Sequence, residues 1–135
     1  MNESFTIAIV SWDLHAGDLL SVRHRVFVEE QGVAAEREVD EFDPLSLHFL
    51  ARDSSGSPIG TERLLPDSRI GRVAVLREWR RRGVGRALMV SAMAGARERG
   101  DRSVTLHAQT HSLSFYRSLG FVALGDEFEE EGIPH

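Results

Sequence analysis

The chain of 135 residues contains no cysteine and no lysine. Without cysteine it can form neither disulfides nor thiolate metal sites, and it has no cysteine nucleophile. All 16 basic residues are arginine, which we attribute to genome composition. No segment approaches the ~20 apolar residues of a membrane-spanning helix. The first residues carry acidic groups where a secretion signal would be basic. We therefore expect a cytoplasmic protein that has no membrane partner.

The remaining composition is ordinary for a globular protein, with 41% hydrophobic and 27% charged residues. No repeat or low-complexity linker divides the sequence, so we expect residues 1–135 to form one domain. The formal net charge of −5 argues against nucleic-acid binding, even though three arginines stand together. The sequence gives no indication of the oligomeric state.

Periodicity and turn signals predict alternating strands and helices. A helix over 13–30, capped by Asp13, contains the apolar residues Leu19, Val22 and Val26 at spacings of three and four. Gly100 and Gly120 are predicted to end two further helices, and Thr110 or Ser112 to cap the second of these. A polar loop is predicted over 32–44. The strands are predicted at 5–10, 47–53, 59–65, 69–76, 103–109 and 121–128, and the further helices at 85–99 and 112–119. The order β-α-β-β-β-α-β-α-β indicates a single α/β domain with a mixed, mostly antiparallel sheet flanked by helices.

The segment between the strand at 69–76 and the next helix reads "RRRGVG". Backbone N–H groups at a helix start have no partner within the helix, and the helix dipole is positive there. Glycines allow a ligand to approach such a backbone closely, and arginine adds permanently charged donors. The segment lacks the Lys-Ser/Thr ending of a Walker loop and the third glycine of a dinucleotide fingerprint. It predicts a phosphate site, with a solvated charged loop as the alternative.

Together with "FYRSLGF" at 115–121, this segment resembles the GNAT superfamily of N-acetyltransferases. The stretches "RHRVFVEEQG", "GTERLLPDSRIGRVAVL", "LHAQ" and "FEEEGIPH" resemble its ElaA-like branch. The resemblance implies that the loop binds the pyrophosphate of acetyl-CoA, with the pantetheine arm pairing along the preceding strand. It implies that Tyr116 returns a proton to the departing thiolate and that the N–H of Val75 donates to the carbonyl oxygen. Gln109 stands where many members have asparagine to contact the arm. The implied cofactor-binding residues are Val73, Ala74, Val75, Arg80, Arg81, Arg82, Gly83, Val84, Gly85, Arg86 and Gln109.

Attack by an amine on a thioester also needs a base, directly or through water. Glu62 lies within a strand beside the expected cofactor strand, and Glu41 lies in an acidic loop with Asp40 and Asp43. Acidic residues near the acceptor side favour a cationic amine. The spacing of the histidines does not predict a metal site. The other candidates for the base remain open: Glu29, Glu30, His24, His48 and His107.

These residues predict an acetyl-CoA-dependent N-acyltransferase that acts on a primary amine of a small molecule or protein. Two alternatives remain. A non-catalytic CoA-binding module would keep the loop without needing Tyr116. An enzyme like the acyl-homoserine-lactone synthases is the other, because "VRHRVFVEEQ" resembles their start.

Overall fold

A computed structural model of the chain describes residues 4–124, 128–130 and 133–135. Its internal contacts divide the chain into two compact units, Met1–Thr105 and Leu106–His135.

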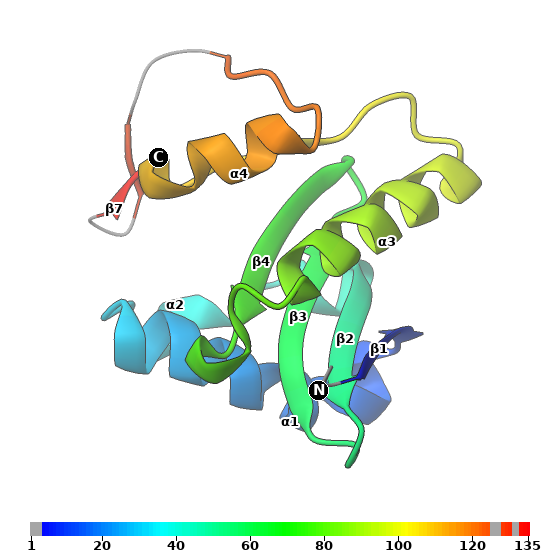
Figure 1. The fold of residues 1–135 in the computed structure, drawn as a ribbon, viewed down its shortest axis with the longest axis vertical. Helices are drawn as coiled ribbons and strands as arrows, with labels where there is room; N and C mark the ends of the chain where they lie inside the picture. The colour runs from blue at the N-terminus through cyan, green and yellow to red at the C-terminus, as the bar shows by residue number, and fades with distance from the viewer. Residues whose placement is uncertain (1–3, 125–127, 131–132) are drawn as a thin grey trace. The chain divides into compact units, whose positions relative to one another are not determined.

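A five-stranded mixed sheet with the order β1-β2-β3-β4-β5 organises the fold (Figure 1). The strands β1 (Phe5–Val10), β2 (Leu47–Asp53), β3 (Pro58–Leu64) and β4 (Arg69–Val75) pair antiparallel in sequence order. The strand β5 is short, Thr105–Leu106, where the sequence predicted a strand over 103–109. The predicted fold class, an α/β domain with helices flanking a mostly antiparallel sheet, is confirmed.

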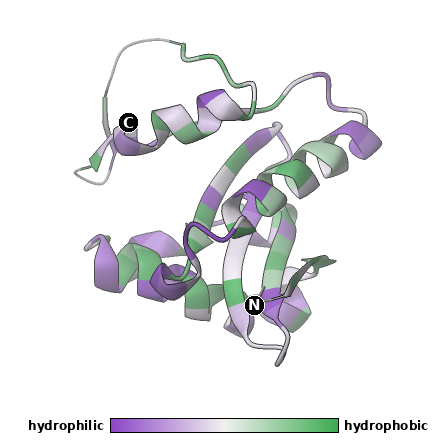
Figure 2. Ribbon diagram, in the orientation of Figure 1, coloured by the Kyte–Doolittle hydropathy of each residue, from purple (hydrophilic) through white to green (hydrophobic). Residues whose placement is uncertain are grey.

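The long helix α3 (Val84–Arg99) lies across one face of the sheet, and α1 (Trp12–Arg23) packs against β3 as well (Figure 1). A methyl group built on Gly60 of β3 would lie 3.0 Å from Val84 and 3.2 Å from Leu88. One built on Gly95 would lie 3.2 Å from the ring of Phe49. The two glycines therefore let the helix approach the sheet closely, and Figure 2 shows apolar residues along these packed elements. Val84 and Leu88 pack against Gly60 of β3, and this contact holds the first turns of α3 against the sheet.

The first helix begins one residue earlier than predicted. The Oγ of Ser11 accepts a hydrogen bond from the N–H of Leu14 at 3.4 Å, so Ser11 is the cap and Asp13 lies in the first turn. Beyond α1 the helix continues as a π-helix, η1 (His24–Glu30). Leu19, Val22 and Val26 are buried, as their spacing predicted.

The predicted polar loop at 32–44 contains a short helix, α2 (Ala35–Glu38), and the start of a 3₁₀ turn, η2 (Asp43–Leu45). Three arginines, one each from α1, β3 and β4, hold this segment by hydrogen bonds and ion pairs: Arg23, Arg63 and Arg72. Their partners are backbone carbonyl groups and three carboxylates of the segment: Glu38, Asp40 and Asp43. We call residues 37–43 the clamped segment. Buried charges of this kind require such pairing, which sequence periodicity does not reveal.

The second unit contains η4 (Thr110–Ser112), α4 (Leu113–Ser118) and a hairpin of β6 (Glu129–Glu130) and β7 (Ile133–Pro134). Ser112 is the N-cap residue of α4, as one of the two predicted alternatives had it, although its side chain makes no capping hydrogen bond. The 3₁₀ turn leads directly into the helix. Gly120 has φ of 96° after the end of α4, as expected of a C-terminal glycine. The predicted strand over 121–128 is absent at 121–124, and residues 125–127 lie outside the described part. Among the described residues no helix is long and apolar enough to cross a membrane.

Candidate functional site

The turn between β4 and α3 places several backbone N–H groups at the start of a 16-residue helix. After the 3₁₀ turn η3 (Arg77–Trp79), Arg81 has φ of 62° and Gly83 has φ of 86°. Gly83 in the left-handed region stands directly before the right-handed residues of α3, and such a pairing turns successive N–H groups toward one side, which makes an anion-binding concavity. The first i to i−4 bond of α3 runs from the N–H of Ala87 to the carbonyl of Gly83. Gly83 is the cap residue, and it has no side chain that could accept a hydrogen bond from the N–H groups between Gly83 and Ala87. A methyl group built on Gly83 would meet nothing within 4 Å, so the space beside it is open.

The side chain of Arg80 is bound within the protein. Its Nη1 and Nη2 each donate to Glu30 at 2.7 Å, and its Nε donates to the carbonyl of Val75 at 3.0 Å. Hydrogen bonding to Arg80 lowers the pKa of Glu30. Arg80 thereby connects the end of η1 to the end of β4. The pairing of Glu30 with this loop gave no signal in the sequence.

The other basic side chains of the turn are exposed, and Figure 2 shows the hydrophilic colour of the segment between β4 and α3. The guanidinium of Arg82 stacks over the ring of Trp79, 5.1 Å from its centroid. Arg81 and Arg86 are exposed as well. The predicted arginine-glycine segment is therefore a surface turn that ends at a buried helix residue, Val84.

Val75, the last residue of β4, directs its backbone groups away from β3. Gly60 lies opposite Val75, and the N–H of Leu76 donates to the carbonyl of Ile59 at 2.9 Å. In an antiparallel ladder this pattern leaves the residue between such bonds with its N–H and C=O pointing to the other edge. The contact of Arg80 with the Val75 carbonyl fits that direction. The N–H of Val75 thus faces the outer edge of β4, on the side of the sheet order where β5 follows.

A β-bulge interrupts β4 just before these residues. The register advances two residues from Thr61 to Arg63 on β3 but three from Ala74 to Gly71 on β4, and Arg72 has φ of 50°. Two residues of β4, Arg72 and Val73, therefore oppose Glu62 alone. Bulges of this kind bend a strand and occur often beside active sites.

Glu62 is 1% exposed, and neither of its carboxylate oxygens has a hydrogen-bond partner among the described residues. It lies opposite Phe49, whose ring contacts α3 at Gly95, so Glu62 points toward the α3 face of the sheet. Burial raises the pKa of Glu62 well above its usual value, because the charged form has left water without gaining a partner. Such a carboxyl keeps its proton beyond the pH at which an ordinary glutamate ionises.

The acidic loop carries less free charge than its sequence indicates. Arg63 donates to both oxygens of Asp40 at 2.6 and 2.8 Å, which lowers the pKa of Asp40 to about 2. Asp43 is fully buried between Arg23 and Arg63. Glu41 is exposed on the outer side of the clamped segment. Of the three acidic residues at 40–43, only Glu41 is directed to solvent.

Two histidines that were candidate bases have defined surroundings. His48 is buried, with Nε2 2.6 Å from the carbonyl oxygen of Asp43, and burial lowers its pKa. In the second unit Nδ1 of His107 lies 3.2 Å from Glu130, and its ring stands edge-on to that of Phe128. His48 is a satisfied core residue, whereas His107 is exposed beside a carboxylate. His24 is exposed on η1.

Tyr116 lies on α4 in the second unit, half-buried. Its ring is 5.1 Å from that of Phe115 and 6.0 Å from that of Phe121. The N–H of Phe121 donates to the carbonyl of Tyr116 at 3.1 Å, so the chain folds back under the tyrosine. Gln109, also half-buried, precedes η4.

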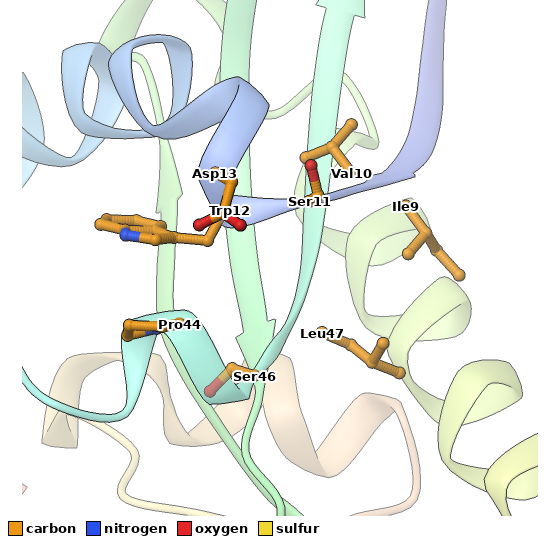
Figure 3. A pocket seen from close by; sticks show the side chains of 8 residues that line it. All are labelled: Ile9, Val10, Ser11, Trp12, Asp13, Pro44, Ser46 and Leu47. Carbon is orange, nitrogen blue, oxygen red and sulfur yellow. The ribbon is translucent and has the colours of Figure 1, made fainter.

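A hollow of about 370 Å³ lies near the end of β1 and the start of β2 (Figure 3). In Figure 3 the indole of Trp12 and the ring of Pro44 lie along its wall, and that indole stacks on His48 with ring centroids 5.1 Å apart. None of its lining residues was predicted as a site residue. Among the described residues, no group of three His, Asp or Glu side chains is placed to hold a metal ion.

The sequence model of a family described as acetyltransferase (GNAT) domain matches residues 20–135. The chain belongs to the GNAT family. A relative from Bacillus subtilis named "uncharacterized N-acetyltransferase YjcF" is 37% identical over 122 residues, covering 87% of this chain and 86% of YjcF. The crystal structure of Escherichia coli ElaA is similar with a TM-score of 0.82 and 27% identity, covering 98% and 95% of the two chains. An acyl-CoA N-acyltransferase from Pseudomonas aeruginosa gives 0.81 and 29%, covering 99% and 96%. The predicted family, its ElaA-like branch and the class of acyltransferase enzyme are confirmed.

The first unit of this GNAT protein brings together the arginine-glycine turn, the outer edge of β4 and the buried Glu62. Tyr116 and Gln109 belong to the second unit. The sequence missed Glu30 as the partner of Arg80 and Glu130 as the neighbour of His107. Neither pair stands at a spacing that a local pattern reveals, since 50 and 23 residues separate the partners.

Proposed function

We propose that this protein transfers an acetyl group from acetyl-CoA to a primary amine by direct attack within a ternary complex. The observation that carries the proposal is the turn between β4 and α3, where Arg81 and Gly83 adopt left-handed conformations at the start of a long helix. We propose further that residues 1–135 act as one domain, in the cytoplasm.

The turn fits a pyrophosphate. Backbone N–H groups of residues 82–86 are the donors that we assign to it, and the positive end of α3 favours the negative charge. Open space beside Gly83 allows close approach. In this proposal Arg81, Arg82 and Arg86 add charge at the rim, and Arg80 acts through its contacts with the protein.

The outer edge of β4 fits the pantetheine arm. Amide groups of an extended ligand pair with a strand edge as an added strand does, and we assign this pairing to Val73, Ala74 and Val75. Gln109 is the amide side chain that we assign to the same arm. The bulge at Arg72 turns the strand at the point where pairing with a ligand would begin.

Acetyl-CoA supplies an activated thioester carbonyl. The N–H of Val75, directed outward, would donate to that carbonyl oxygen as it becomes negative, and such a donor is worth roughly 3 kcal/mol in other acyl-transfer enzymes. Tyr116 would return a proton to the departing sulfur. A phenol with an ordinary pKa of about 10 suits a thiolate that leaves as a base.

For the base we propose Glu62. Its two oxygens have no hydrogen-bond partner within the part of the chain that the structure describes, and its pKa is raised, which makes its ionised form a stronger base than an exposed carboxylate. Its fully buried position in the free protein requires that the acceptor or a water reach it when both substrates are bound. Glu41, exposed on the clamped segment, is assigned to attraction of a cationic amine.

Two measurements test the proposal. Titration calorimetry with acetyl-CoA checks binding, and a panel of polyamines, amino sugars and peptides with thiol release as the readout checks transfer. Binding together with amine-dependent release supports the enzyme. Binding without release from any amine would favour the alternative of a non-catalytic CoA-binding module, and no binding would refute the assignment of the turn.

A further inference from the structure

We propose that Glu30 is a positioning residue for the phosphate-binding turn, acting through Arg80. The inference rests on the proposed function, since it concerns how the same turn is held ready for acyl-CoA. Glu30 ends the π-helix η1, and Arg80 opens the sequence whose N–H groups are assigned to the pyrophosphate.

The guanidinium of Arg80 is anchored on two sides. Its two terminal nitrogens each donate to a different oxygen of Glu30 at 2.7 Å, a bidentate pair. Its Nε donates to the carbonyl of Val75 at 3.0 Å. Three of the five N–H groups of an arginine are thus used within the protein. Arg77 adds a weaker contact to the same carboxylate at 3.5 Å.

These contacts fix the backbone immediately before the concavity. Arg80 is extended, with φ of −70° and ψ of 154°, and Arg81 then enters the left-handed region at φ of 62°. A left-handed arginine is strained and persists only where its surroundings hold it. The side chain of Arg80 folds back to β4 and η1, so it holds the main chain at the point where the left-handed turn begins.

Simple electrostatics predicts the opposite effect of a change at Glu30. Removing a carboxylate near a site for a multiply charged anion should strengthen binding, and it would also free Arg80 to reach the phosphates. A positioning role predicts weaker binding, because the freed turn must be ordered again by the ligand. The sign of the change therefore separates the two accounts.

The experiment measures CoA binding by titration calorimetry for the parent, Glu30→Gln, Arg80→Gln and the double variant. Glu78→Gln is the matched control, because Glu78 lies in η3 beside the same turn and pairs with Arg25 of η1 at 3.2 Å. We expect Glu30→Gln to weaken CoA binding about two- to fivefold, which corresponds to about 0.4–1 kcal/mol. Glu78→Gln should leave affinity unchanged or slightly increased.

Two further readouts identify the route of the effect. If Glu30 acts through Arg80, then Glu30→Gln adds no loss in the Arg80→Gln background. Pantetheine, which lacks the pyrophosphate, should compete equally well in the parent and in Glu30→Gln, whereas general loosening of the fold would weaken it too. If Glu30→Gln does not fold, Arg80→Gln breaks the same pair from the other side and must show the loss.

Equal or tighter CoA binding by a folded Glu30→Gln overturns the inference while leaving the proposed function intact. An equal loss of CoA affinity in Glu78→Gln also overturns the inference, because the loss would then follow from removing any carboxylate or any ion pair near the turn. Failure of the parent to bind CoA refutes the proposed function and this inference with it.

Discussion

Replacing Glu62 by glutamine should change the pH dependence of stability in a way that follows from its burial. The carboxyl is 1% exposed and has no hydrogen-bond partner among residues 4–124, 128–130 and 133–135, so the folded state holds its proton more tightly than the unfolded chain does. Burial therefore raises the pKa of Glu62 on folding well above the usual value of a glutamate. Glutamine keeps the shape of the side chain but cannot ionise.

The direction of the effect follows from proton binding in the two states. Below pH ~4 both states are protonated, and ionisation of Glu62 contributes nothing to stability. Above the unfolded pKa and below the folded one, the unfolded state has lost a proton that the folded state keeps. The free energy of unfolding of the parent then falls by about 1.4 kcal/mol per pH unit on account of this group, and levels off above the folded pKa. Glu62→Gln lacks this loss, so its stability relative to the parent should rise with pH over the same interval.

Urea unfolding between pH 4 and 8, followed by tryptophan fluorescence, measures the effect. Both tryptophans, Trp12 and Trp79, lie in the unit that contains Glu62. Glu41→Gln is the control, because Glu41 is exposed and should give a curve parallel to that of the parent. If the curve of Glu62→Gln also stays parallel to the parent, then Glu62 ionises as an ordinary glutamate, and the argument for a tuned base fails with it.

Three further predictions concern the proposed reaction. Gly83→Val should weaken acetyl-CoA binding at least tenfold, and Gly85→Val should weaken it to a smaller degree. The reason is that φ of 86° at Gly83 disfavours a side chain and that a Cβ would stand where the ligand approaches. Unchanged affinity by calorimetry in a folded variant would refute the turn as the phosphate site. Tyr116→Phe keeps the contacts with the neighbouring rings and should lower kcat by roughly 10²–10⁴-fold without changing the affinity for acetyl-CoA, the usual range for one acid–base group; full turnover would leave the tyrosine as a packing residue. Glu41→Gln should raise KM for a cationic amine at low salt, with the effect shrinking as salt screens it, and a KM ratio near one at low salt would show that Glu41 does not attract the acceptor.

The features that the sequence predicted well depend on local chemistry. Gly100 ends α3 with φ of 94° and accounts for the helix boundary without any distant contact. The buried positions Leu19, Val22 and Val26 follow from helical spacing. The family itself was predictable because the turn at 80–85 and the residues around Tyr116 stand in a recognisable order along the chain.

The features that the sequence did not predict depend on partners far apart in the chain. The sequence made Glu30 a candidate base, whereas in the structure both of its carboxylate oxygens accept hydrogen bonds from Arg80. Asp43 was counted as loop acidity, yet it is buried between two arginines. The bulge at Arg72 also left no pattern, because a bulge shows only once the neighbouring strand is aligned. The length of β5 was overestimated because "SVTLHAQ" has strand propensity over more residues than the sheet uses.

If Glu41 attracts the acceptor as proposed, the clamped segment has a consequence for how acceptor preference changes during evolution. Its backbone is held from inside by arginines of α1, β3 and β4, while Arg37, Val39, Glu41 and Phe42 face solvent. Substitution of Glu41 costs little folding free energy, because this exposed side chain takes no part in the buried ion pairs that the described residues form. A substitution can therefore place a new charge or aromatic ring at the surface of the clamped segment without changing the conformation of its main chain. Acceptor preference would then diverge among relatives through single substitutions on this unchanged backbone rather than through insertions that alter the loop.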